Sequence, residues 1–182
     1  MTHVGIALID PHKIFSAVGL SKGMRVADFG CGRTGHFVFV AAKVVEDVGV
    51  VYAVDIMKEV LENIKSRVRS EGFDNVQIIW SDIESEGKTP ITGGSLDVCF
   101  FVNVVSQLKN RTAALKEAMR LLKPGGKVVV VDWSKKIGPL GPEEDKMLNP
   151  GKVSMLGSDC GFTVEGTGSA GDYHFYSILK KI

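Results

Sequence analysis

The chain has 182 residues, 45% of them hydrophobic, and its 22 Lys and Arg nearly balance its 21 Asp and Glu. This length favours a single domain, because domains average about 150 residues. The net charge of +1 provides no overall field to gather nucleic acid or an anionic membrane. No apolar run approaches the roughly 18 residues of a transmembrane helix, which argues against a membrane span.

Three cysteines are scattered singly, at Cys31, Cys99 and Cys160. An odd number without paired spacing argues against a disulfide framework and against CxxC-type zinc or redox motifs. The first residues also lack the basic stretch and apolar run of a secretory signal. We therefore expect one domain over residues 1–182, located in the reducing cytoplasm. The sequence leaves the oligomeric state open.

Glycines and prolines separate the apolar segments and predict alternating helices and strands. Asp10-Pro11 is typical of a helix start, so we expect a short helix within an N-terminal helical segment, residues 1–22. In chain order we predict helix 11–18, strand 24–29, helix 36–47, strand 50–54, helix 57–72, strands 76–80 and 96–102, a helix containing Leu115, Ala118, Met119 and Leu122, strand 127–132, a short helix from Asn149 to Gly161, and strands 162–167 and 173–179.

This order of elements predicts the fold class. Strands that alternate with helices form a parallel sheet covered on both faces. The spacing around residues 168–172 adds a closing β-hairpin, which an ordinary doubly wound nucleotide-binding fold does not require. Segment 134–150, rich in glycine and proline, is expected to form a lid loop.

A glycine-rich loop, GCGRTG at residues 30–35, lies between the first predicted strand and a helix. Glycines let the backbone turn sharply and approach a ligand closely, and the helix N-terminus offers free N–H groups to an anion. In this context the pattern favours a nucleotide-like cofactor, with a bare tight turn as the alternative.

Asp28, Asp55 and Asp82 lie at or near the carboxyl ends of three successive predicted strands. Open α/β sheets bind their ligands at that edge. Asp55 could accept hydrogen bonds from both ribose hydroxyls, and Asp82 from an adenine amino group. Their alternatives are a helix N-cap for Asp55 and an ordinary loop residue for Asp82. An acidic rim suits a ligand with cationic and hydroxyl groups better than a dinucleotide with two phosphates.

In this order the motifs resemble those of class I S-adenosylmethionine-dependent methyltransferases over nearly the whole chain. VADFGCG at residues 26–32 resembles the family's first motif, YAVDI at 52–56 its second-strand motif, and SDI at 81–83 its adenine-amino motif. DVCFFVN at 97–103 resembles the fourth-strand motif beside the transferred methyl, and LLKPGG at 121–126 a later signature. The layout is most similar to small-molecule methyltransferases of the ubiquinone/menaquinone-biosynthesis type.

The resemblance implies a Rossmann-like α/β fold: a seven-stranded, mostly parallel sheet with helices on both faces and a C-terminal antiparallel hairpin. It implies S-adenosylmethionine (SAM) as cofactor, with Asn103 as the catalytic residue beside the methyl and His36 covering the methionine end. The residues expected to bind the cofactor are Asp28, Gly30, Cys31, Gly32, Gly35, His36, Asp55, Ile56, Ser81, Asp82, Ile83 and Asn103.

The glycine loop departs from the family pattern, because it is one residue longer than the usual GxGxG. The contacts of Arg33 and Thr34 therefore stay open. A nicotinamide-dependent oxidoreductase is one alternative function, and a non-catalytic cofactor-binding subunit is another. Asp82, the Pro-Gly-Gly turn, the hairpin and the lack of a Tyr-x-x-x-Lys pair argue against the oxidoreductase.

Methyl transfer from a sulfonium leaves a neutral thioether, so holding the groups in line can supply much of the catalysis, up to about 7–11 kcal/mol. A general base is needed only if the acceptor loses a proton, and no residue stands out as one. The chain adds little to the family core, which favours a small-molecule acceptor over a protein or nucleic acid. Four dispersed histidines do not predict a metal site.

Overall fold

A computed structural model describes residues 8–182. The elements are α1 (Pro11–Val18), β1 (Arg25–Phe29), α2 (His36–Val45), β2 (Val50–Asp55), α3 (Lys58–Glu71), β3 (Val76–Trp80), β4 (Leu96–Val102), the 3-10 helix η1 (Val105–Gln107), α4 (Arg111–Leu121), β5 (Leu122–Trp133), the 3-10 helix η2 (Glu144–Lys146), α5 (Pro150–Asp159), β6 (Phe162–Ser169) and β7 (His174–Lys181). The N-terminal helical segment predicted for residues 1–22 is described from residue 8 onward, and its first seven residues lie outside the described part.

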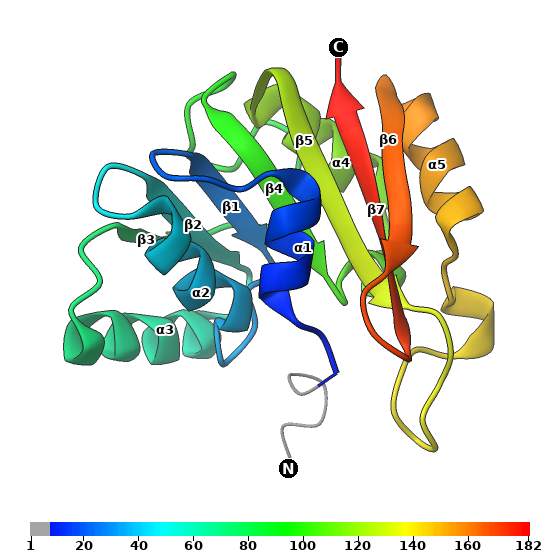
Figure 1. Ribbon diagram of the computed structural model, residues 1–182, viewed down its shortest axis with the longest axis horizontal. Coiled ribbons are helices and arrows are strands. Elements are labelled where there is room, and N and C mark those ends of the chain that lie inside the picture. Colours follow the sequence, from blue (N-terminus) through cyan, green and yellow to red (C-terminus); the bar gives the residue numbers. More distant parts are fainter. Residues whose placement is uncertain (1–7) are drawn as a thin grey trace.

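The strands form one seven-stranded sheet in the order β3-β2-β1-β4-β5-β7-β6 (Figure 1). Strands β1 to β5 run parallel, whereas β7 is antiparallel to both β5 and β6. The predicted α/β class, the mostly parallel sheet and the C-terminal antiparallel hairpin are confirmed. Because the strand order reverses between β1 and β4, the glycine loop after β1 and the end of β4 meet at a switch point, where such sheets bind ligands.

Each face of the sheet packs against its own helices. α1, α2 and α3 share one apolar core with the side chains of Val129 and Val131. α4 and α5 share the other core with Val128 and Val130 of the same strand. Alternate residues of β5 therefore serve opposite cores, which is the pattern of a strand buried on both faces.

Most predicted elements have bounds close to those observed, and strands 76–80 and 96–102 match. The helix predicted for 36–47 ends at Val45, because the Asn75 side-chain amide donates to the carbonyl oxygens of Ala42 at 2.8 Å and Glu46 at 2.9 Å. Leu122 does not belong to the preceding helix as predicted. It pairs with Leu96 and begins β5 five residues earlier than the expected Lys127.

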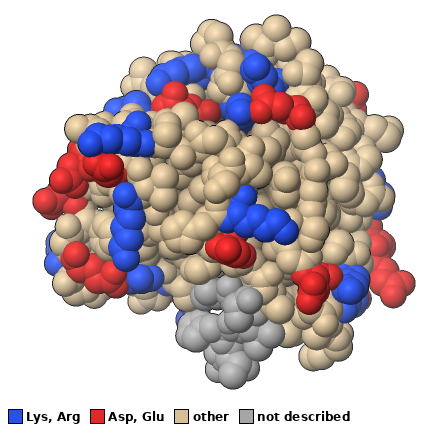
Figure 2. Space-filling model, viewed as in Figure 1, with Lys and Arg blue, Asp and Glu red and all other residues tan. Residues whose placement is uncertain are grey.

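The surface shows no segregation of charge on the face drawn in Figure 2, where acidic and basic side chains are interspersed among uncharged ones. Among residues 8–182, no helix has both the length and the apolar character needed to cross a bilayer. All three cysteines are buried free thiols.

Candidate cofactor and acceptor site

The glycine loop passes over the end of β2. The amides of Gly30 and Cys31 both donate to the carbonyl oxygen of Val54, at 2.8 Å and 3.1 Å. Gly30 has a φ of 75°, and a Cβ added to it would lie 2.6 Å from a methyl group of Val104. No larger residue fits there, because the left-handed backbone and the close contact both select glycine. A Cβ on Gly32, by contrast, would meet nothing within 4 Å.

The lengthened end of the loop is held by α3. Arg67 donates from Nη1 to the carbonyl oxygen of Thr34 at 2.8 Å, and its guanidinium lies 4.0 Å from the centre of the Phe39 ring. Gly35 begins α2 with a φ of 54°, and a Cβ there would lie 2.7 Å from Ile64 and 2.9 Å from Phe39. Thr34 is thus anchored through its backbone, and Gly35 faces the packing between α2 and α3.

A cavity of about 200 Å³, here called the inner cavity, lies between the glycine loop, α2 and the end of β4. Its lining residues are Ile9, Asp28, Gly30, Cys31, Gly32, Thr34, His36, Phe37, Val102 and Asn103. The structure therefore brings together six of the residues expected to bind the cofactor. Gly35, Asp55, Ile56, Ser81, Asp82 and Ile83 do not line this cavity.

Three lining residues of the inner cavity carry buried polar atoms without a hydrogen-bond partner among the described residues: Asp28 Oδ1, His36 Nε2 and Asn103 Oδ1. Buried polar atoms are normally paired, so three such atoms around one cavity need an explanation. An occupant that donates hydrogen bonds would satisfy them.

Asp28 is the acidic group of this cavity and is 3% exposed. Burial raises the pKa of its carboxyl group from 3.8 to about 7, and the nearby charge of Asp55 adds to the effect. A cationic group bound beside Asp28 would reverse this by favouring the ionised form.

Two further lining residues, His36 and Asn103, differ from ordinary surface residues, the first in its pKa and the second in its backbone conformation. Burial lowers the pKa of His36, which favours the neutral ring. Its Nε2 has no hydrogen-bond partner among the described residues, and in one of the two neutral tautomers this nitrogen is an acceptor. Asn103 has a left-handed φ of 57°, an uncommon conformation that is found more often at functional sites. Its backbone amide donates to Val131 at 2.8 Å.

Asp55 ends β2 beside the inner cavity and holds two backbone amides. Its Oδ2 accepts from Gly32 at 3.2 Å, and its Oδ1 accepts from Met57 at 2.9 Å, next to the start of α3. The adjacent Ile56 side chain is 56% exposed, and its carbonyl oxygen accepts from the Trp80 indole at 2.9 Å. An apolar surface thus lies beside a carboxylate with free lone pairs.

The segment after β3 is folded on itself. Asp82 accepts from the Glu84 amide at 2.9 Å and from the Ser85 hydroxyl at 3.0 Å, which agrees with the alternative of an ordinary loop residue. The Ser81 hydroxyl lies 3.1 Å from that of Thr89, and Ile83 is buried in the core shared with α4.

Glu117 of α4 holds the segment between β3 and β4 in place through hydrogen bonds. Its carboxylate accepts from the amides of Gly87 at 2.6 Å and Thr89 at 2.9 Å, and pairs with Arg120. Burial opposes its ionisation, but these hydrogen bonds outweigh burial and lower the pKa to about 2. Sequence reasoning missed Glu117, since a single acid in an amphipathic helix gives no sign that it faces inward.

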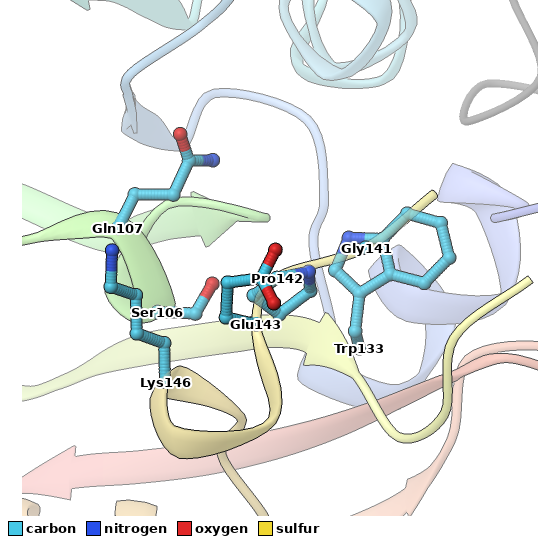
Figure 3. A pocket seen from close by; sticks show the side chains of 7 residues that line it. All are labelled: Ser106, Gln107, Trp133, Gly141, Pro142, Glu143 and Lys146. Carbon is cyan, nitrogen blue, oxygen red and sulfur yellow. The ribbon is translucent and has the colours of Figure 1, made fainter. Parts of the chain in front are cut away.

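A second cavity of about 550 Å³, here called the outer cavity, lies at the ends of β4 and β5 (Figure 3). Figure 3 shows Gln107 and Lys146 on one side of it and the Trp133 ring on the other. Its lining residues are Ser106, Gln107, Trp133, Gly141, Pro142, Glu143 and Lys146. Four of these belong to the segment predicted to be a lid loop, whereas Ser106, Gln107 and Trp133 carry no motif.

The inner and outer cavities adjoin at the end of β4. The side-chain amide of Gln107, in the outer lining, donates to the carbonyl oxygen of Asn103, in the inner lining. Arg111 fixes the wall between η1 and the lid segment, donating to Val105 at 2.9 Å, to Ser106 at 3.2 Å and to Lys146 at 3.4 Å. The linings of the two cavities are therefore joined by a hydrogen bond at the end of β4.

A parallel sheet with an antiparallel seventh strand, a glycine loop after β1 and acids ending β1 and β2 are the features of the class I SAM-dependent methyltransferases. A family profile described as a methyltransferase domain matches residues 20–158. The chain belongs to this family. The expected class of enzyme and its cofactor, SAM, are confirmed by this match and by the structural similarity described next.

The chain is 35% identical over 144 residues to the ubiquinone/menaquinone biosynthesis C-methyltransferase UbiE of Laribacter hongkongensis, covering 78% of this chain and 56% of that protein. It is 30% identical to the demethylmenaquinone methyltransferase of Staphylococcus aureus, over 70% of this chain and 51% of that protein. The chain thus spans about half the length of these relatives.

Among solved structures, the fold is similar to that of a SAM-dependent methyltransferase from Aquifex aeolicus. The TM-score is 0.89 at 26% sequence identity, and the match covers 100% of this chain and 94% of that one. A second similar structure is a type 11 methyltransferase from Sulfolobus solfataricus, with a TM-score of 0.73 at 25% identity over 96% of this chain and 94% of that one.

Proposed function

We propose that this chain transfers a methyl group from SAM to a small-molecule acceptor by in-line displacement. SAM supplies a methyl group on a sulfonium, which leaves as a neutral thioether. The observation that carries the proposal is the pair of adjoining cavities at the end of β4, one for the cofactor and one for the acceptor, linked by the Gln107–Asn103 hydrogen bond.

The inner cavity fits the amino-acid end of SAM. Three of its buried polar atoms, Asp28 Oδ1, His36 Nε2 and Asn103 Oδ1, have no hydrogen-bond partner within residues 8–182. With the proton of the neutral His36 ring on Nδ1, all three are acceptors and match the three N–H donors of an ammonium group. No side chain from residue 8 onward caps the N-terminus of α2, so its free N–H groups suit the carboxylate. The backbone of Gly30, Cys31 and Gly32 lines the path between them.

The adenosine half has its proposed contacts along β2 and β3. Asp55 uses each oxygen once within the protein, and a carboxylate can accept about four hydrogen bonds, so lone pairs remain for ribose hydroxyls. The exposed face of Ile56 suits adenine, with Ser81, Asp82 and Ile83 at its far edge. Gly35 contributes by letting α2 and α3 pack closely.

The acceptor is proposed to occupy the outer cavity. A volume of about 550 Å³ lies within the range of small-molecule sites, about 300–1,000 Å³. Asn103, which lines the inner cavity and accepts a hydrogen bond from Gln107 of the outer lining, is proposed to position the reacting groups. Segment 134–150 is proposed to act as a lid over a single domain, residues 1–182. Holding the groups in line requires no acid at the sulfur.

A thermal-shift comparison tests the cofactor assignment. SAM and S-adenosylhomocysteine at 100 times Kd are expected to stabilise the protein by about 2.7 kcal/mol, whereas NAD(H) leaves its Tm unchanged. A shift with NADH and none with SAM would overturn the assignment. Formation of S-adenosylhomocysteine with a small-molecule panel then separates an enzyme from a non-catalytic subunit.

A further inference from the structure

A buried carboxylate lies directly behind the wall of the outer cavity. Asp132, near the end of β5, is 0% exposed. Its Oδ1 accepts from the Ser106 hydroxyl at 2.9 Å and from the Trp133 amide at 2.9 Å, and its Oδ2 accepts from the Ser106 amide at 3.0 Å. All three donors belong to residues that line the cavity. The carboxylate is therefore coupled to the cavity although it has no surface of its own.

The Ser106 hydroxyl has a fixed direction of hydrogen bonding. A serine hydroxyl carries one proton, and Ser106 gives that proton to Asp132, so its oxygen can act only as an acceptor toward other groups. Figure 3 shows this hydroxyl on the side of Ser106 that faces Pro142 and Trp133. An occupant of the outer cavity that meets Ser106 must therefore bring a donor.

Asp132 is the carboxylate of this cavity wall that can take up a proton. The charge of Arg111 favours the ionised form of Asp132, and Glu143 and Lys146 line the cavity from the lid segment. Burial raises the pKa of Asp132, although its hydrogen bonds and Arg111 oppose the rise. A carboxylate with a raised pKa takes up a proton more readily than an exposed one.

We propose that Ser106 binds a hydroxyl group of the methyl acceptor and passes its proton to Asp132. This inference rests on the proposed function, since it concerns the occupant of the outer cavity. The acceptor O–H bond breaks and its electron pair stays on oxygen. The proton moves to Ser106 Oγ, while the proton of Ser106 moves to Asp132 Oδ1, which becomes a neutral acid. Ser106 touches the acceptor, and Asp132 is a positioning residue acting through it.

The class of acceptor follows from the two sides of the cavity. The Trp133 ring supplies a flat apolar wall beside Ser106, and flat aromatic walls favour planar ring systems in offset or edge-to-face contact. A hydroxylated planar ring, such as a phenol, places its ring against Trp133 and its O–H on Ser106. Lys146 also lines the cavity, and its positive charge suits the oxyanion that the proton transfer leaves.

The test uses 4-nitrophenol as probe and 4-nitroanisole as matched control, because the anisole has no O–H. The pH is set below the pKa of the free phenol, and phenolate absorbance above that of free phenol in the same buffer marks transfer of the proton to the protein. We expect wild-type protein to bind the phenol and produce phenolate absorbance. Ser106→Ala is expected to weaken phenol binding about tenfold and to leave anisole binding unchanged.

Two further variants separate the proton relay from a structural role. Asp132→Asn should still bind the phenol but give no phenolate, whereas Ser106→Thr restores both binding and phenolate. Ser95→Ala, which also removes a hydroxyl bonded to one carbonyl but at the opposite edge of the sheet, should behave as wild type. If Asp132→Asn fails to fold, the Ala and Thr variants of Ser106 decide.

The outcome is decided by the contrast between phenol and anisole. Equal phenol affinity of wild type and Ser106→Ala, no phenol binding to wild type, or no phenolate in wild type overturns the proposal. A thermal shift with SAM, measured on every variant, shows separately whether the fold and the proposed cofactor site are intact. Failure of the proposed function appears there, as a wild-type protein that does not respond to SAM.

Discussion

Replacing Asp28 with asparagine is expected to stabilise the ligand-free protein and to weaken its binding of SAM. The Asp28 carboxyl group is buried, has an oxygen without a partner among the described residues, and has a pKa raised from 3.8 to about 7. Such a group is unfavourable when charged and alone, and favourable beside a bound cation. The two effects have opposite signs and can be measured separately.

The stability effect follows from the shifted pKa. Between about pH 4 and pH 7 the folded protein keeps a proton on Asp28 that the unfolded chain has lost, so stability falls as the pH rises through this window and is constant above it. The shift of about 3 units corresponds to at most about 4 kcal/mol. Asp28→Asn removes this pH-dependent fall in stability. The unfolding free energy of the variant should therefore exceed that of wild type near pH 8 and match it near pH 4.

The affinity for SAM should depend on pH through the same carboxyl group of Asp28. At about pH 6 the free protein must lose the Asp28 proton to pair with an ammonium group, so affinity should rise almost tenfold per pH unit up to about pH 7. Above about pH 7.7 the ammonium itself deprotonates and affinity falls. Calorimetry in buffers of different ionisation heat should detect close to one released proton. The Asn variant should bind more weakly and lack the rising limb.

The matched control is Asp74→Asn, at an exposed position before β3, which should leave both stability and SAM affinity unchanged. The reasoning fails if wild-type affinity for SAM is constant between about pH 5 and pH 7. It also fails if Asp28→Asn is less stable than wild type near pH 8.

Three other substitutions test the site. Asp55→Ala should weaken SAM binding by about 1–3 kcal/mol in calorimetry, and unchanged affinity would remove Asp55 from the site. Glu117→Gln should lower the unfolding free energy by about 3 kcal/mol in denaturant titrations near pH 7, because it breaks a buried charge network. Because the pKa of Glu117 is lowered, that difference should shrink as the pH falls below about 4; a pH-independent difference would contradict this. Gly35→Ala should lower the unfolding free energy by about 2 kcal/mol or more through close contacts. Gly72→Ala, where no described atom lies within 4 Å of the added Cβ, should lower it by about 1 kcal/mol; equal losses would refute the packing role of Gly35.

Local pattern was sufficient to predict most of the fold. Asp10 caps α1 as expected, accepting from the His12 amide at 2.9 Å, because capping depends on neighbours in sequence. The strand bounds at 76–80 and 96–102 follow from apolar runs bordered by polar residues. The motif order likewise led to the methyltransferase family, since each motif is a short segment with its own backbone requirement.

The predicted ends of helices and strands were wrong where a residue far along the chain determines them. α2 stops at Val45 because Asn75, thirty residues along the chain, takes up its last carbonyls. β5 starts at Leu122 because it pairs there with Leu96. No local propensity contains either contact.

Periodicity and short motifs were enough to predict the order of helices and strands, the family and the residues around the glycine loop, because these features depend on neighbours along the chain. Only the tertiary structure joined Ser106 to Asp132, since the parallel register of β4 and β5 aligns the segments that follow Val102 and Val131. The tertiary structure also brought together, around one cavity, atoms of Asp28, His36 and Asn103 that have no partner in the part of the chain described. Burial and hydrogen-bond satisfaction are properties of packing between distant segments, so they come into existence only when the chain folds.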